Sequence, residues 1–212
     1  MNLITIDGPA GSGKGTIAKQ LSEVLKLNYL DSGAIYRILG LHLIENNIPI
    51  DNEDLIKKSI EKANIQFSRH KISLNNRDVT DEIRTESIAK IASLIAANKT
   101  VRESILDLQR SFLKKPGLVA EGRDMGTVVF PEAKNKFFLT ASVQERADRR
   151  YKQLISKGFD VSIADLVVEI QERDFRDINR TISPLVPAAN AVIIDTTKLS
   201  PSQVVEFILG NI

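Results

Sequence analysis

GPAGSGKGT (residues 8–16) lies between the short apolar run NLITID (2–7) and a helical pattern from about Lys14 to Leu27. Glycines let the backbone turn tightly and open its N–H groups to anionic oxygens, and the N-terminus of the following helix adds a favourable dipole. Lys14 stands where the lysine of a phosphate-binding loop (P-loop) reaches the β- and γ-phosphates of a nucleoside triphosphate. The residues predicted to bind the triphosphate are Gly8, Pro9, Ala10, Gly11, Ser12, Gly13, Lys14, Gly15 and Thr16.

The loop departs from the strict P-loop pattern at one position. That pattern has Ser or Thr directly after the lysine, whereas here Gly15 intervenes and Thr16 follows. We therefore expect Thr16 to contact magnesium either directly or through water.

Four further short apolar runs indicate strands. They are NYLD (28–31), GLVAEG (117–122), KFFLTA (136–141) and AVIIDT (191–196), and helical patterns separate them. This alternation predicts an α/β protein with a five-stranded parallel sheet and helices on both faces. The last helix has a clear start, because Ser200 can cap it, Pro201 suits its first position and Gln203 completes a capping box.

Residues 64–80 interrupt the alternation. NIQFSRHKISLNNRDVT has β-type runs separated by polar turn residues, between helical segments at about 52–63 and 82–114. This pattern predicts a small antiparallel sheet within an inserted lobe.

Composition excludes several classes of function. The chain has 212 residues and a net charge of +2 from 29 basic and 27 acidic residues, so bulk charge favours neither nucleic acid nor an anionic membrane as partner. It has no cysteine and two histidines, which excludes thiolate chemistry and disfavours a histidine-rich metal site. No apolar run reaches membrane-spanning length, and the N-terminus does not read as a secretory signal, so we expect a cytoplasmic enzyme.

The segment ERDFRDINR (172–180) contains three arginines at helical spacing. As a helix it would bring Arg173, Arg176, Asp177 and Arg180 onto one stripe. These residues could form ordinary surface ion pairs with neighbouring carboxylates, each worth about 0.3–0.5 kcal/mol. They could instead grip phosphate groups.

A P-loop alone does not identify the kind of nucleotide-dependent protein. A GTP-dependent switch would need an Asn-Lys-x-Asp element, but NKTV (98–101) ends in valine and falls in a helical pattern. A nucleic-acid motor would be longer and more basic. A short chain with an inserted lobe favours a kinase for a small substrate.

Five motifs together resemble the bacterial cytidylate kinases. They occur in the order GPAGSGKGT, DSGAIYR, EGRDMGTVVFP, ERADRR and RDFRDINR, and the resemblance runs from residue 2 to about residue 208. It implies the P-loop kinase fold, with an inserted substrate-binding lobe and a short lid. It also implies transfer of a phosphoryl group from ATP to CMP or dCMP with magnesium.

The resemblance implies a core of residues 1–32, 116–150 and 163–212, a nucleotide-binding lobe at 33–115 with its insertion at 64–80, and a lid at 151–162. The residues that it implies for acceptor binding are Asp31, Ser32, Arg37, Ser93, Arg102, Arg123, Asp124, Arg173, Arg176, Asp177 and Arg180. Asp124 would accept a hydrogen bond from the exocyclic amine of cytosine. Uracil presents a carbonyl there, and sites built on such hydrogen bonds discriminate by up to roughly 10⁴-fold.

On the donor side, the resemblance implies that Arg146 lies against the adenine of ATP and that Arg150 approaches the transferring phosphates. Arg149 falls on another side of the helix and is expected to be mainly solvated. Glu121 stands at a strand end where P-loop enzymes often place a carboxylate that organises magnesium, directly or through water.

The predicted mechanism is positioning and charge neutralisation, since the phosphate of CMP needs no general base. Lys14, Arg150 and Arg180 are the predicted catalytic residues. We expect ATP and CMP or dCMP as small-molecule partners, no nucleic acid or membrane partner, and a monomer. The alternatives are a P-loop kinase for another acceptor, such as UMP, shikimate or dephospho-coenzyme A, and a nucleotide-binding regulator without transferase activity.

Overall fold

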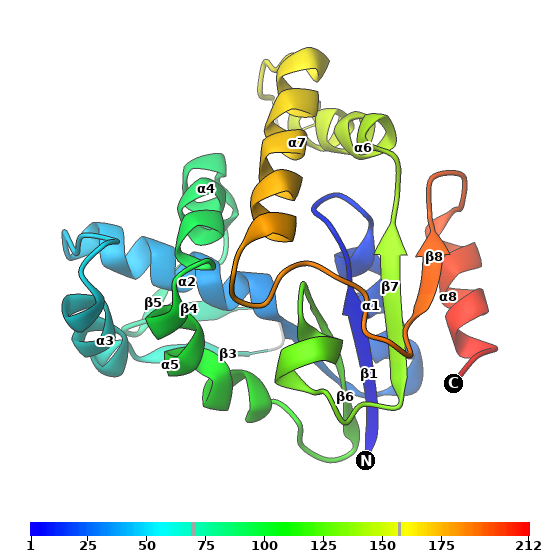
Figure 1. Ribbon diagram of the computed structural model, residues 1–212, viewed down its shortest axis with the longest axis horizontal. Coiled ribbons are helices and arrows are strands. Elements are labelled where there is room, and N and C mark those ends of the chain that lie inside the picture. Colours follow the sequence, from blue (N-terminus) through cyan, green and yellow to red (C-terminus); the bar gives the residue numbers. More distant parts are fainter. Residues whose placement is uncertain (69–70, 157) are drawn as a thin grey trace. The chain divides into compact units, whose positions relative to one another are not determined.

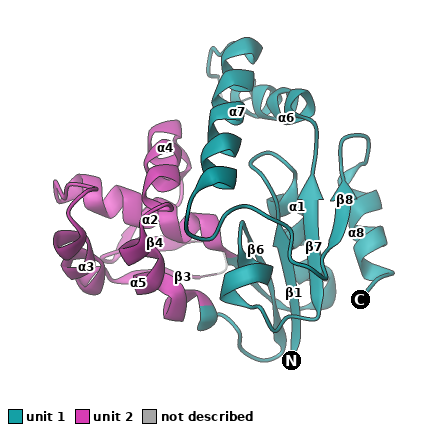
Figure 2. Ribbon diagram, viewed as in Figure 1, with its two compact units in different colours: residues 1–30, 110–212 teal, residues 31–109 magenta. Residues whose placement is uncertain are grey.

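The structure is a computed structural model and describes residues 1–68, 71–156 and 158–212. The chain divides into two compact units (Figure 2). The larger unit comprises residues 1–30 and 110–212, and the smaller comprises residues 31–109.

The larger unit is built on a five-stranded sheet in the order β2-β6-β1-β7-β8 (Figure 1). The strands are β1 (Asn2–Asp7), β2 (Asn28–Asp31), β6 (Gly117–Gly122), β7 (Asn135–Thr140) and β8 (Val192–Asp195). The pairings of β1 with β6, β1 with β7 and β7 with β8 are parallel. The predicted five-stranded parallel sheet is confirmed, and the strand ends agree with the sequence to within one residue.

Strand order places the P-loop at a functional position. β1 lies at the centre of the sheet; β2 and β6 lie on one side of it, and β7 and β8 on the other. The winding therefore reverses at β1. In such sheets ligands bind outside the carboxyl end of the strand where the order reverses, and residues 8–13 begin at that end of β1.

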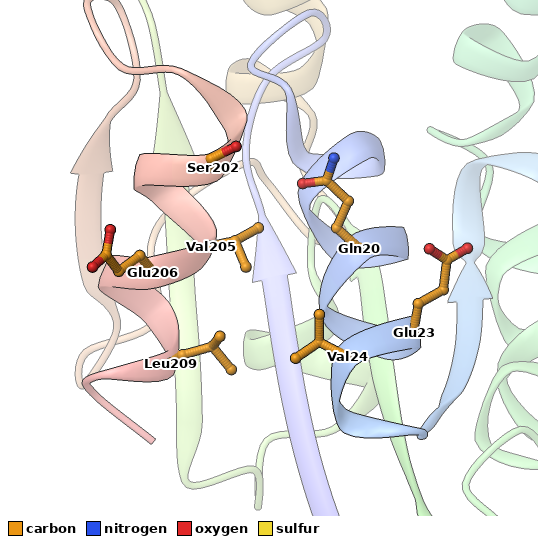
Figure 3. Close-up of a pocket in the computed structure, with 7 residues that line it drawn as sticks. All are labelled: Gln20, Glu23, Val24, Ser202, Val205, Glu206 and Leu209. Atoms are coloured by element: carbon orange, nitrogen blue, oxygen red, sulfur yellow. The ribbon is translucent and has the colours of Figure 1, made fainter.

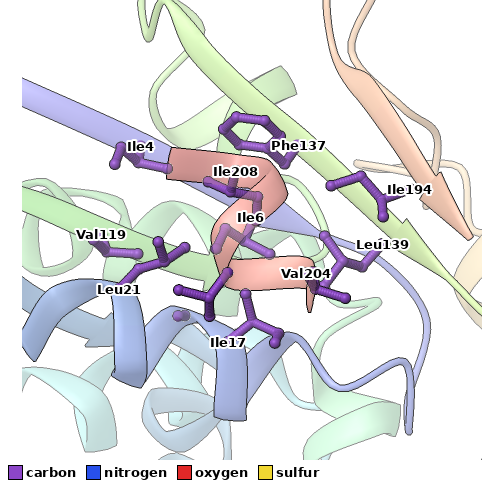
Figure 4. Close-up of a cluster of buried hydrophobic side chains, with 12 residues drawn as sticks. Ile4, Ile6, Ile17, Leu21, Val119, Phe137, Leu139, Ile194, Val204 and Ile208 are labelled. Atoms are coloured by element: carbon purple, nitrogen blue, oxygen red, sulfur yellow. The ribbon is translucent and has the colours of Figure 1, made fainter. Parts of the chain in front are cut away.

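The central strands β1 and β6 are buried on both faces, which explains their continuous apolar runs. Every residue of β6 is buried, as is every residue of β1 after Asn2. Helices α1 (Lys14–Leu25) and α8 (Pro201–Leu209) share one core cluster with strands β1, β6, β7 and β8 (Figure 4). At the start of α8, the predicted capping box of Ser200 and Gln203 is confirmed.

Two further helices of this unit pack against each other. Helices α6 (Val143–Ile155) and α7 (Ile163–Asn179) share a small apolar cluster and begin after the capping serines Ser142 and Ser162. The predicted lid, 151–162, covers the end of α6 and the connection to α7. Residue 157 lies outside the described residues, and the lid assignment stays a prediction.

The smaller unit combines helices with a three-stranded antiparallel sheet. The helices are α2 (Ser32–Glu45), α3 (Glu53–Lys62), the 3-10 turn η1 (Glu82–Arg84), α4 (Glu86–Ile95) and α5 (Lys99–Arg110), whose last residue belongs to the larger unit. The strands are β3 (Ile65–Phe67), β4 (Ile72–Leu74) and β5 (Arg77–Asp78). Their antiparallel pairing confirms the prediction for 64–80, except that residues 69–70 lie outside the described part.

The helical region predicted at roughly 82–114 contains three separate elements, η1, α4 and α5. It is broken at Thr85 and again at residues 96–98. Asn98, placed inside a helix by the sequence pattern, instead accepts a hydrogen bond from Val101 N at 3.1 Å through its side-chain oxygen. Asparagine side chains compete for backbone groups in this way and favour helix starts over interiors.

Within the described residues, none of the helices has the length and apolar character that crossing a membrane requires.

Leu21→Ala tests the packing of α1 on the sheet. Leu21 is fully buried in the core cluster, so removing its side chain should lower the free energy of unfolding by about 2–5 kcal/mol. Val24→Ala on the same helix is the control, because Val24 is 58% exposed and should change stability by less than about 1 kcal/mol. Urea denaturation of both variants measures the difference, and equal losses would contradict this packing.

Candidate active site

The P-loop is fixed by a close approach to the neighbouring strand. A Cβ atom on Gly8 would lie 2.0 Å from the carbonyl oxygen of Leu139 in β7, and Gly8 has φ of 150°. Gly13 precedes α1 in the left-handed conformation, and the first turn of α1 has no acidic residue. The N–H groups at this helix start therefore face no competing carboxylate from their own turn, which favours an anionic ligand.

Lys14 lies over the loop that precedes it. Its Nζ atom donates a hydrogen bond to the carbonyl oxygen of Pro9 at 3.0 Å. The ammonium group is thus held against the P-loop, and the phosphate-binding role of Lys14 stays a prediction.

Asp7, at the end of β1, fastens the P-loop strand to the segment after β6. Its two carboxylate oxygens accept hydrogen bonds from Met125 N and Gly126 N, both at 2.8 Å. Burial raises the pKa of Asp7 to about 6, and the nearby charge of Asp124 adds to the rise, while the two backbone donors and Lys14 oppose it. Asp124, which the sequence assigns to base recognition, is itself 2% exposed.

Glu121 lies beside the first turn of α1. A Cβ atom on Gly15 would lie 2.9 Å from its Oε1 atom, and Tyr29 in β2 donates a hydrogen bond to the same oxygen at 2.5 Å. A side chain at position 15 would therefore require the Glu121 carboxylate to shift. Thr16, one position later, is exposed.

Oxygen donors near the P-loop fit a magnesium ion that keeps water and phosphate ligands. Mg²⁺ in nucleotide sites is usually bound by one or two protein oxygens together with substrate phosphates. Glu121 and Thr16 offer such oxygens close to α1. In the described parts of the chain no group of three His, Cys, Asp or Glu side chains is placed so that it could hold a metal ion.

Asp177 on α7 gathers positive charge around one buried carboxylate. Arg123 Nε donates to Asp177 Oδ2 at 2.8 Å, and Arg180 Nη1 lies 4.0 Å from Oδ1. Burial alone would raise the pKa of Asp177, but the charge and hydrogen bond of Arg123, with the charges of Arg173 and Arg180, outweigh burial and lower it. The carboxylate is therefore ionised at neutral pH.

The predicted four-residue helical stripe is wrong at its end. α7 stops at Asn179, and Arg180 has an extended backbone with φ of −66° and ψ of 138°. Its guanidinium group reaches Asp177 from outside the helix and also donates to the carbonyl oxygen of Ser183. Arg176 differs from the others: it is half-exposed and pairs with Glu172 at 3.9 Å, the surface ion pair weighed from the sequence.

The three arginines of α6 have different surroundings. Arg146 is 3% exposed and donates to Asp174, Ala10 and Ala141. Arg150 donates to Gln153 Oε1 at 2.8 Å, and burial lowers its pKa while Glu169 opposes the change.

The expectation that Arg149 is mainly solvated is wrong. It donates to Glu145 at 2.8 Å and to the carbonyl oxygen of Thr196 at 2.7 Å, and the hydroxyl of Thr196 lies 3.0 Å from the carbonyl oxygen of Ser12. Thr196 is thus a buried link between the end of β8 and the P-loop.

In the smaller unit, the candidate residues at the start of α2 support the local backbone. Asp31 caps α2 by accepting from Ala34 N at 3.0 Å, and Ser32 accepts from Gln109 at 2.8 Å. Arg37 donates to the carbonyl oxygen of Ile83 at 3.0 Å.

The other two candidates of this unit lie on α4 and α5. Arg102 donates to the carbonyl oxygen of Ala96 at 2.9 Å, and its guanidinium carbon lies 5.7 Å from the centre of the Tyr36 ring. Ser93 is 8% exposed. Arg102 therefore lies over the ring of Tyr36 at a distance typical of a cation–π interaction.

A groove between α1 and α8 is separate from these residues. It has a volume of about 360 Å³ and contains none of the predicted site residues (Figure 3). Its lining consists of Gln20, Glu23, Val24, Ser202, Val205, Glu206 and Leu209.

Sequence reasoning missed Asp7, Tyr29, Asp174 and Thr196. Asp7 had a signal, because a carboxylate ends an otherwise apolar strand. The other three had none: a tyrosine in a short strand, one more acid in a charged helix and a threonine after a strand are ordinary surface patterns.

Comparison with known proteins gives consistent matches. A family model described as cytidylate kinase matches residues 4–212. The chain is 48% identical over 216 residues to a cytidylate kinase of Shewanella pealeana, covering 99% of this chain and 94% of that protein. It is 49% identical over 208 residues to one of Salmonella arizonae, covering 96% and 92%.

A solved structure supports the fold alone. A protein of Thermus thermophilus aligns over 100% of this chain and 97% of its own, with 16% identity and a TM-score of 0.50.

Gly8→Ala tests the close approach of the P-loop to β7. The added methyl group would overlap a backbone oxygen, so we expect a loss of stability of more than about 3 kcal/mol or failure to fold. Gly210→Ala is the control: its Cβ would meet its nearest atom at 3.6 Å and φ is −76°, so stability should change by less than about 1 kcal/mol. Thermal unfolding of both variants compares them, and a stable Gly8→Ala would contradict the loop geometry.

The pKa values of the two buried aspartates should be shifted in opposite directions, that of Asp7 upward and that of Asp177 downward. Asp7 binds a proton in the folded chain between its unfolded value, 3.8, and about 6, so its contribution to stability is largest below about pH 4 and falls as the pH rises to 6. Asp177, with a lowered pKa, contributes above its unfolded value and loses that contribution as the pH falls through the folded value. Carboxyl ¹³C NMR, assigned with Asp7→Asn and Asp177→Asn, measures both; an Asp7 pKa at or below 4 would contradict this geometry.

Proposed function

The chain belongs to the cytidylate kinase family, and we propose that it transfers the γ-phosphoryl group of ATP to CMP or dCMP, giving ADP with CDP or dCDP. The observation that carries the proposal is the gathering of Arg123, Arg173 and Arg180 around Asp177 in the same compact unit as the P-loop. The P-loop is the binding site expected for the triphosphate. A second cluster of positive charge in the same unit indicates a second substrate that carries a phosphate group.

We assign ATP to the P-loop. Its phosphates would be held by the backbone N–H groups of residues 8–16 and by Lys14, which already lies against the loop. Arg150 is proposed to approach the transferring phosphates. Arg146, which donates a hydrogen bond to the P-loop carbonyl of Ala10, is proposed to lie against the adenine of ATP.

Magnesium is proposed as the metal cofactor. Thr16 and Glu121 would hold it, directly or through water, and Tyr29 would orient the carboxylate of Glu121. When bound, the ion would neutralise negative charge on the phosphate groups of the nucleotide.

We propose that CMP is held through its phosphate and its base. The residues assigned to the acceptor are Asp31, Ser32, Arg37, Ser93, Arg102, Arg123, Asp124, Arg173, Arg176, Asp177 and Arg180. Charge-assisted bonds from arginine to phosphate are worth about 1.5–3 kcal/mol each, several times a surface ion pair. Burial of Asp124 supports base discrimination, because its carboxylate and the carbonyl oxygen of uracil are both hydrogen-bond acceptors and would repel each other.

The proposed chemistry is a direct phosphoryl transfer. A phosphate oxygen of CMP forms a bond to the γ-phosphorus of ATP while the bond from that phosphorus to the bridging oxygen breaks, and ADP leaves. The acceptor phosphate is already anionic near neutral pH, so this step needs no general base. Lys14, Arg150 and Arg180 would align the two polyanions and neutralise the charge of the transferring group.

The division into core (1–32, 116–150 and 163–212), acceptor lobe (33–115) and lid (151–162) is part of this proposal. We also propose a cytoplasmic monomer with no nucleic acid or membrane partner. The near balance of 29 basic and 27 acidic residues supports the last point.

An acceptor panel tests the proposed function. The chain is incubated with ATP and magnesium and with CMP, dCMP, UMP, shikimate or dephospho-coenzyme A, and ADP formation is measured in a coupled assay. We expect CMP or dCMP to give the fastest turnover. Preference for UMP would contradict the role of Asp124, and tight ATP binding without ADP formation would indicate a regulator.

Lys14→Ala and Arg180→Ala should each lower kcat for CMP by at least about 100-fold, because each removes a positive charge from the reacting phosphates. Lys19→Ala is the matched control, since Lys19 is exposed on α1 and should keep turnover within about twofold. Circular dichroism checks folding. Turnover of either active-site variant at the rate of Lys19→Ala would contradict the assignment.

A further inference from the structure

Arg146 bridges three segments of the larger unit. Its Nη1 atom donates to the carbonyl oxygen of Ala10 in the P-loop at 3.2 Å, and Nε donates to that of Ala141 after β7 at 3.0 Å. Its Nη1 and Nη2 atoms donate to the two carboxylate oxygens of Asp174 on α7 at 2.9 and 2.6 Å. The side chain of Arg146 on α6 therefore contacts the P-loop, the segment after β7 and α7.

The P-loop is packed against this arginine as well as bonded to it. A Cβ atom on Gly11 would lie 3.1 Å from Arg146 Cβ. The backbone of the loop at Gly11 thus packs on the stem of Arg146, while the guanidinium group is hydrogen-bonded to the loop and to α7.

Asp174 sits among the residues assigned to the acceptor phosphate. It follows Arg173 directly and precedes Asp177 by three positions, close to one turn of α7. Its carboxylate faces Arg146, whereas the carboxylate of Asp177 faces Arg123. On the same helix, Asp174 therefore pairs with an arginine assigned to ATP, and Asp177 pairs with an arginine assigned to the acceptor.

We propose that Asp174 is a positioning residue that couples the two nucleotide sites. By holding Arg146 in a bidentate pair, it ties the P-loop to the helix that carries Arg173 and Asp177, so that ordering of the loop by ATP fixes the acceptor-phosphate residues. This inference rests on the proposed function.

The geometry argues against an ion pair that serves stability alone. The side chains of Arg146 and Asp174 are only 4% and 16% exposed, and burying a salt bridge often yields little net stability because both charges lose water. The bidentate fork, with two further carbonyl acceptors, instead fixes orientation. Lysine carries the same charge but cannot make this set of bonds.

The experiment measures coupling between substrates. Calorimetry gives the Kd of CMP with and without a non-hydrolysable ATP analogue (adenylyl imidodiphosphate) and magnesium. We expect the analogue to tighten CMP binding to the wild-type chain at least fivefold, and by linkage CMP should tighten the analogue by the same factor. Asp174→Asn should reduce this factor to below two, change the Kd of each ligand alone by less than about threefold, and lower kcat at least tenfold.

Three variants complete the test. Asp165→Asn on α7 is the control, because Asp165 is exposed, and it should keep the wild-type coupling. Asp174→Glu keeps the carboxylate and should restore most of the coupling that Asp174→Asn loses. Arg146→Lys should lose coupling as Asp174→Asn does, and it serves if Asp174→Asn does not fold.

Several results would overturn the inference. They are full coupling in Asp174→Asn or in Arg146→Lys, a lower melting temperature of Asp174→Asn with coupling unchanged, and a wild-type chain whose substrates bind independently. Failure of the proposed function would look different, because the wild-type chain would then form no ADP with CMP.

Discussion

Three arginines surround the buried carboxylate of Asp177 in the larger unit, and the proposed phosphate site depends on this concentration of positive charge. Asp177 has Arg123 at 2.8 Å and Arg180 at 4.0 Å, with the charge of Arg173 also lowering its pKa. These four side chains carry three positive charges and one negative, in surroundings where burial weakens screening. Phosphate oxygens are negatively charged acceptors that suit arginine, so this concentration of positive charge favours binding of a phosphate group.

The phosphate loop imposes a second, steric constraint. Gly8 presses against the carbonyl oxygen of Leu139, Gly15 leaves room for Glu121, and Asp7 fastens the segment that carries Asp124. The loop is thus fixed by the sheet beneath it. Because preorganised donors need not reorient during the reaction, such rigidity suits catalysis by positioning. Arg149 and Thr196 add fastenings from the α6 and β8 side.

Sequence patterns predicted most of the larger unit because strands buried on both faces give continuous apolar runs, and because glycines and one lysine mark a P-loop. They failed where a side chain bonds to nearby backbone groups or to a residue far away in the sequence. Asn98 bonds to the backbone and separates two helices, and Arg180 leaves the helix that its spacing suggested. Arg149 looked solvated because its partner Thr196 lies 47 positions away. Asp174 resembles any helical acid until Arg146 is seen against it. The arginines of the site could be predicted from the sequence, but the carboxylate that each one faces could not, because some of the partners are distant in the sequence.

The central claim is that the arginine cluster recognises a phosphate group. Calorimetric titration with CMP and with cytidine tests it most directly, because the two ligands differ only in that group. Two charge-assisted bonds of about 1.5–3 kcal/mol each predict that cytidine binds at least about 100-fold more weakly than CMP. Equal affinities for the two ligands would contradict the claim.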